Sequence, residues 1–207
     1  MDASRLTTEV ATDTGRKRPK PGERRLQILQ TIAAMLEEGA SEKVTTAALA
    51  ARLSISEAAL YRHFASKAQM FEGLLDFIEE TIFSLINQID AREISPAARG
   101  QEIIRMLLSF AEKNPGMTRV LIGDAIVNED LRLQHRVNQI YERIELSLKQ
   151  CARLDGVEGQ KSTALSPAEQ SSLAMAYVAG RWLQFAKTGF RKRPSEHSDA
   201  AVNRLFA

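Results

Sequence analysis

Apolar side chains recur at every third or fourth position along most of this chain, which is the spacing of helices that bury one face. Serines and threonines that can cap a helix stand just before several of these periodic stretches. The pattern predicts an all-α fold of about nine helices. Their expected ranges are 23–38, 45–53, 56–61, 66–90, 95–114, 117–126, 128–153, 166–188 and 199–206.

Two short predicted helices, separated by the turn Ser54-Ile55-Ser56, are the most informative part of this pattern. Thr45 or Thr46 can cap the first helix, and Ser56 can cap the second. Two short helices that cross at a tight turn make a helix-turn-helix, whose second helix fits the major groove of DNA. An ordinary helix pair in a bundle shows the same spacing, so the outer face must decide. The predicted inward positions are Ala47, Leu49, Ala50, Leu53, Ala59, Leu60 and Phe64.

The outward-facing side chains of this pair favour DNA binding. Tyr61 offers a ring to a thymine methyl group and a hydroxyl to a phosphate. Thr46, His63 and Lys67 carry donors that suit the phosphate backbone. Two paired heads about 34–36 Å apart imply a palindromic double-stranded site. The predicted DNA-contacting residues are Thr45, Thr46, Ser56, Glu57, Ala58, Tyr61, Arg62, His63 and Lys67, with Arg16 and Arg18 from the segment before the first helix.

Residues 1–22 lack a helical period and end in a basic, proline-containing run from Arg16 to Gly22. Such a run is either a solvated charge cluster or an arm that follows DNA, and its place beside a helix-turn-helix favours the arm. We therefore expect a disordered basic arm over 1–22, a DNA-binding domain over 23–68 and a helical regulatory and dimerisation domain over 69–207. Residues 1–25 carry a net charge of +3 and the remainder a net of −1, which favours local contact with DNA.

The helix expected after Ser166 is apolar over too wide a surface for a single core. Small residues along it allow close approach of another helix. The helix is either buried at the centre of the fold or part of a two-fold homodimer interface, and paired recognition helices favour the interface. The side chains concerned are Leu173, Ala174, Ala176, Tyr177, Ala179, Gly180, Trp182 and Leu183.

Several classes of protein are not expected. The chain has no Gly-rich phosphate loop, no His/Cys cluster at metal-ligand spacing and no nucleophile motif, so we expect neither an enzyme nor a cofactor or metal. No apolar stretch is long enough to span a membrane, and the polar beginning lacks a signal-peptide core, so we expect a cytoplasmic protein. The single cysteine, Cys151, fits a structural position on a helix.

The segment from Thr45 to Leu75 resembles the DNA-binding half of TetR-family regulators. Its most specific part is Tyr61-Arg62-His63-Phe64 followed by Ser66-Lys67. The resemblance implies a TetR-like fold with a three-helix head, a helical dimerisation body and a role for Lys67 in holding a phosphate. Two departures stand out, namely Ser54 where the turn usually carries glycine and Ala65 where the linker usually carries proline.

The likeness extends over about residues 23–195 and points to one branch of the family, the nucleoid occlusion factors. The segments DFIEETI, AEKNPGMTRVLIGDA and NQIYERIE carry it. The resemblance implies a nucleoid-associated homodimer that binds chromosomal sites, engages FtsZ and blocks Z-ring assembly over DNA. It leaves open whether dimers assemble further on DNA. The matching partner-binding positions are Phe77, Met106, Lys113 and Asn114, and sequence alone leaves Phe77 either in the core or on an exposed patch.

A ligand-responsive TetR-type repressor is the alternative function. It would need a cavity in the body, for which aromatic and thioether side chains are available. Plain core packing is the favoured explanation for the same side chains. They are Phe110, Met117, Trp182 and Phe185.

Overall fold

The computed structural model describes residues 22–38, 44–127, 129–158 and 165–206, and within these ranges the fold is all-α, as predicted. A short 3-10 helix, η1 (Asp124–Ile126), accompanies the α-helices. The α-helices are α1 (Glu23–Glu38), α2 (Thr46–Leu53), α3 (Glu57–Tyr61), α4 (Lys67–Asp90), α5 (Pro96–Lys113), α6 (Pro115–Leu121), α7 (Leu131–Glu158), α8 (Pro167–Lys187) and α9 (Asp199–Leu205).

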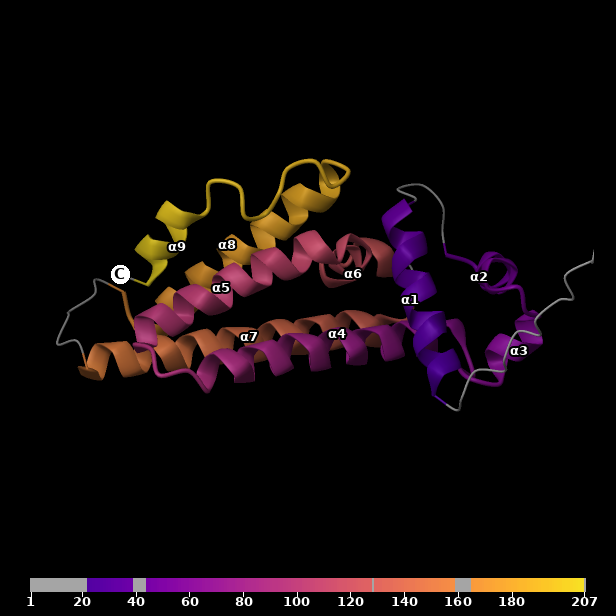
Figure 1. The fold of residues 1–207 in the computed structure, drawn as a ribbon, viewed down its shortest axis with the longest axis horizontal. Helices are drawn as coiled ribbons and strands as arrows, with labels where there is room; N and C mark the ends of the chain where they lie inside the picture. The colour runs from indigo at the N-terminus through magenta and orange to yellow at the C-terminus, as the bar shows by residue number, and fades with distance from the viewer. Residues whose placement is uncertain (1–21, 39–43, 128, 159–164, 207) are drawn as a thin grey trace, which may run out of the picture.

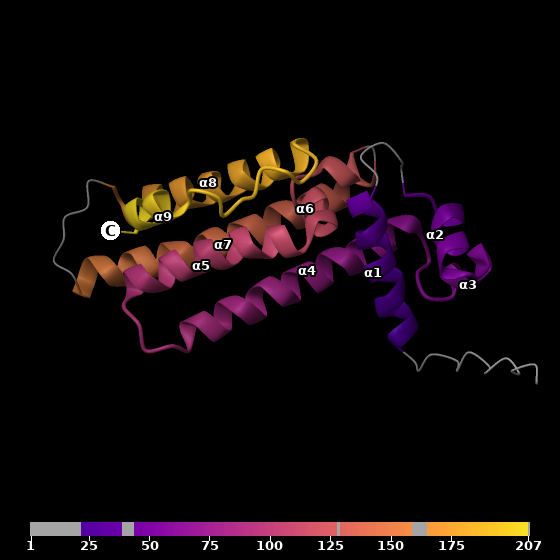
Figure 2. The same ribbon diagram turned by 45° about the horizontal axis from the view of Figure 1, so that its top comes forward.

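The helices form a small head at one end of an elongated body (Figure 1). The head consists of α1, α2 and α3, and α1 lies across the end of the body, between α2–α3 and the long body helices (Figure 2). In the body, α7 packs against α4, α5 and α8, while α9 returns to cover α5 and α8. The long helix α4 starts at the head and runs the length of the body, so it belongs to both parts.

The predicted apolar stripes form one continuous core. Along α4 it takes up Met70, Phe71, Leu74, Leu75, Ile78, Ile82, Ile86 and Ile89. Trp182 is completely buried, and its ring Nε1–H donates to the carbonyl of Leu107 at 3.1 Å. Phe110, Met117 and Phe185 are buried as well, so the four side chains considered for a ligand cavity pack into the protein interior.

Three apolar positions expected in the core lie at the surface instead. Leu26 is 40% exposed, Leu131 is 81% exposed, and Ala47 is exposed on the outer side of α2. Leu26 and Leu131 both stand in the first turn of their helices. The apolar spacing includes them, but the part of each helix that packs against the core begins after them. Periodicity therefore locates the stripe but overestimates its length by about one turn.

Helix boundaries in the middle of the chain differ from the prediction. One helix was expected over 117–126, but Gly123, with φ +81°, separates α6 from η1. Helix α7 begins at Leu131 rather than at residue 128, which itself lies outside the described residues. It continues to Glu158 through the start of a predicted loop, because Gly156 is tolerated inside a long helix at modest cost.

The head is fixed to the body mainly where α1 meets α6. A Cβ atom at Gly116 would lie 1.9 Å from the carbonyl oxygen of Ala33, so only glycine permits this approach. Arg119 donates to the carbonyl of Leu36 at 3.2 Å and pairs with Asp124 at 2.8 Å. Hydrogen bonds from Lys187 and Arg119 hold the pKa of Asp124 below its usual value, which ties α8 to the same junction.

Candidate nucleic-acid interface and partner pocket

The predicted helix-turn-helix is built by local capping. Thr45, rather than Thr46, caps α2, and its hydroxyl accepts from the N–H of Ala48 at 3.1 Å. Ser54 ends α2 in the left-handed conformation with φ +53°, the position where the family favours glycine. Ser56 then caps α3 by accepting from the N–H of Ala59 at 3.2 Å. These caps set the tight turn that presents α3 to the outside.

One exposed face gathers most of the predicted DNA contacts. Leu60 and Phe64 are buried, with Phe64 beside Gly73 of α4 and Arg25 of α1, which leaves the opposite side of α3 outward. Tyr61 is 45% exposed, and the charged or polar positions beside it are open. The exposed predicted contacts are Thr45, Ser56, Glu57, Ala58, Tyr61, Arg62 and His63. Arg16 and Arg18 lie outside the described residues.

Thr46 is already engaged inside the head. Its hydroxyl donates to a carboxylate oxygen of Glu57 at 2.6 Å, so the first residue of α2 holds the first residue of α3. This bond fixes the angle between the two helices at the face expected to meet DNA. The Thr46 hydroxyl can donate to a DNA phosphate only after its hydrogen bond to Glu57 is broken.

Arg25 connects α1 to the end of α3. Its side chain donates to the carbonyl of His63 at 2.9 Å. Its guanidinium also stacks over the ring of Phe64, 4.1 Å from the centroid. Arg25 therefore positions the end of the recognition helix α3, while Arg24 donates to Gln27 on its own helix.

Lys67, the predicted phosphate ligand, is paired with an anion of the body. Its ammonium lies 2.5 Å from a carboxylate oxygen of Glu129, and both side chains are mostly shielded from solvent. The lysine stands at the first position of α4, where the helix dipole favours a nearby negative charge. Glu129 supplies that charge here, a partner that sequence spacing gave no means of finding.

Ser66 and Gln69 form only one half of a capping box at the start of α4. The Ser66 hydroxyl accepts from the N–H of Gln69 at 3.1 Å, as expected. The Gln69 side chain, however, accepts from Ala65 at 2.8 Å instead of from Ser66. By contrast, the box of Ser166 with Glu169 at the start of α8 is complete.

A pocket of about 320 Å³ opens where the head meets the body. It brings together Phe77 of α4 with Lys113 and Asn114 at the end of α5, three of the four predicted partner-binding residues. Phe77 is partly buried, so it both packs against the core and lines the pocket. Met106 does not line it, but lies partly buried two turns earlier on the face of α5 that carries Lys113.

One wall of this pocket comes from α1. The sequence analysis did not predict this wall. Four of the lining residues belong to α1 and two belong to α6. The small side chains in the middle of α1 were the only sequence signal that α1 packs closely against α6. These additional residues are Gln30, Ala33, Ala34, Glu37, Gly116 and Met117.

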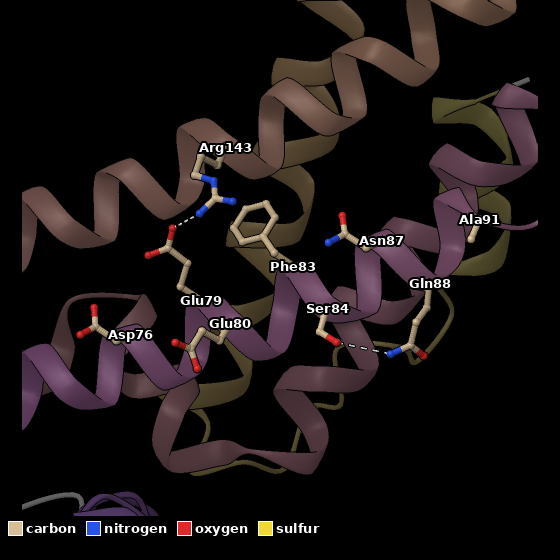
Figure 3. Close-up of a pocket in the computed structure, with 9 residues that line it drawn as sticks. All are labelled: Asp76, Glu79, Glu80, Phe83, Ser84, Asn87, Gln88, Ala91 and Arg143. Atoms are coloured by element: carbon tan, nitrogen blue, oxygen red, sulfur yellow. Dashed lines mark hydrogen bonds and ion pairs between the residues drawn. The ribbon is translucent and has the colours of Figure 1, made fainter.

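A larger hollow of about 770 Å³ runs along α4 beside α7 (Figure 3). Arg143 stacks on the ring of Phe83, 3.8 Å from its centroid, and pairs with Glu79. Arg136 of α7 also pairs with Glu79, at 2.6 Å, and with Asp76, at 2.8 Å. Asp76 and Glu79 of α4 are thus paired with cations of α7 along this hollow.

Within the ranges described, no group of three or more His, Cys, Asp or Glu side chains is placed to hold a metal ion. Among the same residues, no helix combines the length and apolar character needed to cross a membrane. Burial raises the pKa of the Cys151 thiol to about 11, which fits a structural cysteine in α7.

A helix-turn-helix head on a helical body defines a TetR-type regulator. Residues 28–74 match the family of bacterial regulatory proteins of the tetR type, and residues 96–206 match the SlmA-like, tetracyclin repressor-like C-terminal domain. A TetR transcription regulator from Haloarcula marismortui has the same fold, with a TM-score of 0.75, 17% sequence identity and coverage of 89% of this chain and 96% of that one.

Sequence relatives narrow this class. The nucleoid occlusion factor SlmA of Idiomarina loihiensis is 45% identical over 177 residues, which cover 86% of this chain and 90% of that protein. SlmA of Alteromonas mediterranea is 44% identical over 190 residues, or 90% and 97% of the two chains. This chain belongs to the SlmA family of nucleoid occlusion factors, a branch of the TetR family. The names of these relatives describe regulators rather than enzymes.

Proposed function

We propose that this protein is a nucleoid occlusion factor that binds specific palindromic DNA as a homodimer, engages FtsZ and blocks Z-ring assembly over the nucleoid. The observation that carries the proposal is the pocket that unites Phe77, Lys113 and Asn114 beside the DNA-binding head. The head over 23–68 reads DNA in this proposal, and the body over 69–207 dimerises and receives the partner.

The head has the features that DNA recognition requires. Its exposed face presents Tyr61 at the C-terminal end of α3, with Arg62 and His63 directly after it. The bond between Thr46 and Glu57 and the contacts of Arg25 hold α3 in place before DNA arrives, which reduces the entropy lost on binding. Arg16 and Arg18 complete the proposed contacts as an arm along the DNA backbone.

The outer face of α8 supports a homodimer. Leu173 and Leu183 are 48% and 46% exposed, and Ala176 and Gly180 are exposed between them on the same side of the helix. A Cβ atom at Gly180 would meet nothing within 4 Å, so the space beside it is open in one protomer. Apolar and small residues on one exposed helix face suit a close two-fold contact with a second copy.

The pocket suits a peptide tail that is partly apolar and partly acidic. Phe77 and Met117 supply apolar contact area, Lys113 supplies a positive charge, and the Asn114 amide belongs to the same rim. An FtsZ tail of that chemistry can place an apolar side chain against Phe77 and a carboxylate near Lys113.

A ligand-responsive repressor has weaker support. Its cavity needed Phe110, Met117, Trp182 and Phe185, but Phe110, Trp182 and Phe185 are buried. Met117 instead lines the pocket beside Phe77. The Trp182 N–H is satisfied by the carbonyl of Leu107 and leaves no free donor for a ligand.

Fluorescence anisotropy of a labelled C-terminal FtsZ peptide, measured with and without palindromic DNA, tests the proposal. We expect saturable binding that Phe77→Ala and Lys113→Glu each weaken by at least tenfold. Lys149→Glu, on the body helix α7, makes the same charge change away from the pocket and should bind as the wild type does. Absence of peptide binding under both conditions, with DNA binding intact, would contradict the FtsZ role and favour the ligand-responsive repressor.

A further inference from the structure

Glu37 is the charged side chain that α1 contributes to the pocket of about 320 Å³ beside Phe77, to which we refer as the Phe77 pocket. Gln30, Ala33, Ala34 and Glu37 line it from positions i, i+3, i+4 and i+7, so they share one face of α1. The proposed function uses Phe77 and the cation of the pocket, but it gives this carboxylate no role.

The pocket carries two charges of opposite sign that do not neutralise each other. Glu37 of α1 and Lys113 at the end of α5 both line it, and both are exposed. Among the residues that the structure describes, neither forms an ion pair with the other or with any third group. Both charges are therefore available to a guest, and a guest that is only acidic would meet repulsion from Glu37.

The place of Glu37 in its helix increases the demand for a cation. It stands in the last turn of α1, where the helix dipole is negative and a carboxylate is unfavourable. That turn contains no basic residue, and its other carboxylate, Glu38, is paired with Arg52. Arg119, which donates to a carbonyl of the same turn, is paired with Asp124. A guest cation beside Glu37 would thus offset both its charge and the end of the dipole.

The hydrogen bond of Asn114 favours the same kind of guest. The Asn114 Nδ2 donates to the carbonyl of Phe110 at 2.8 Å, while none of the described residues donates to its Oδ1. The polar lining of the pocket therefore offers an amide oxygen in addition to the Glu37 carboxylate. Oxygen acceptors of this kind are the partners that the side chains of lysine and arginine require.

The backbone that carries Glu37 is held in place by α6. A Cβ atom at Gly116 would lie 1.9 Å from the Ala33 carbonyl oxygen and 3.2 Å from the Glu37 nitrogen, so the end of α1 packs directly on the start of α6. Fixed backbone loses little further freedom when a guest binds, which favours a specific contact over a diffuse one.

We propose that Glu37 is a further partner-binding residue, and that the segment in the Phe77 pocket carries a basic and an acidic residue close to an apolar one. The apolar side chain contacts Phe77, the carboxylate pairs with Lys113 and the basic side chain pairs with Glu37. This inference rests on the proposed function and specifies the chemistry of the FtsZ tail that it requires. Two opposite charges at fixed places also set the direction of the bound segment, which a single charge leaves open.

The test reverses the Glu37 charge in the full-length protein. Glu37→Gln and Glu37→Lys are titrated by fluorescence anisotropy with the labelled C-terminal FtsZ peptide at saturating palindromic DNA. The same titrations use a peptide whose lysines and arginines are replaced by glutamine. Glu93→Lys is the matched control, because Glu93 is exposed in the connection from α4 to α5 and lies outside the pocket lining.

We expect Glu37→Gln to raise the Kd of the natural peptide about two- to fivefold at low salt, and Glu37→Lys to raise it at least tenfold. Both effects should shrink as salt screens the charges, and Glu93→Lys should match the wild type. The peptide without basic residues should bind wild type and Glu37→Gln alike, and it should still respond to Lys113→Glu.

Tighter binding of the natural peptide by Glu37→Lys would show that an acidic part of the guest lies beside this position, and would overturn the inference. Unchanged binding by both Glu37 variants would overturn it as well, and so would a loss that persists with the peptide lacking basic residues. In each of these cases the response to Lys113→Glu leaves the FtsZ role intact. If the wild type binds no peptide, the proposed function and this inference fail together.

Discussion

Lys67 is the residue at which the two halves of the molecule meet. It stands at the start of α4, within the segment that resembles the DNA-binding half of the family, yet Glu129 of the body holds its ammonium at 2.5 Å. A phosphate and a carboxylate are both anions that a lysine at a helix N-terminus accepts. In the proposed complex DNA competes with Glu129 for Lys67, and we expect the pair to lower DNA affinity by the cost of breaking it.

A double-mutant cycle on this pair tests that competition. Glu129→Gln should strengthen DNA binding about two- to fivefold at low salt, because a partly exposed ion pair contributes up to about 1 kcal/mol. Lys67→Ala should weaken binding to every sequence and reduce the log–log salt slope by about two, because each protomer of the homodimer loses one phosphate contact. The combined variant should behave like Lys67→Ala alone, measured by anisotropy over a salt series. A gain from Glu129→Gln that persists without Lys67 would show that the carboxylate acts on DNA directly.

At the scale of elements, sequence reasoning succeeded where the signal is local. The caps at Thr45, Ser56 and Ser166 follow from residue type and spacing within four positions, and the structure forms all three. Contacts between segments far apart in the chain could not be predicted from the sequence. The pairing of Lys67 with Glu129 spans 62 positions, and no periodicity encodes such a meeting. For the same reason the α1 wall of the pocket was missed.

The α1–α6 contact should be sensitive to a single methyl group. Gly116→Ala would place a Cβ atom 1.9 Å from the Ala33 carbonyl oxygen, so α1 and α6 must separate. Overpacking of this kind costs about 1–3 kcal/mol, and we expect the Tm to fall by about 5 °C. Gly156→Ala is the control, because nothing lies within 4 Å of its added Cβ and alanine favours the helix. Thermal unfolding followed by circular dichroism measures both, and an equal Tm for the two variants would refute the tight contact.

At the scale of the whole molecule, we propose that the exposed face of α8 forms the two-fold contact of the homodimer. Leu183→Glu adds a charge to this face without disturbing the core, since Leu183 is 46% exposed in one protomer. We expect a folded monomer by analytical ultracentrifugation and a loss of at least tenfold in affinity for a palindromic site. Gln88→Glu, exposed on α4, changes the charge equally and should remain dimeric. A dimer that survives Leu183→Glu would move the interface to another face.

The pocket between α1 and α5 has a thermodynamic consequence. One wall belongs to the element that carries the DNA reader and the others belong to the body, so a guest that contacts both restricts the angle between them. Restricting that angle for one ligand alters the affinity for the other, and linkage makes the effect equal in both directions. A peptide that binds more tightly to the DNA-bound protein must increase the affinity of the protein for DNA by the same free energy. The target of inhibition would then help to keep its inhibitor on the chromosome.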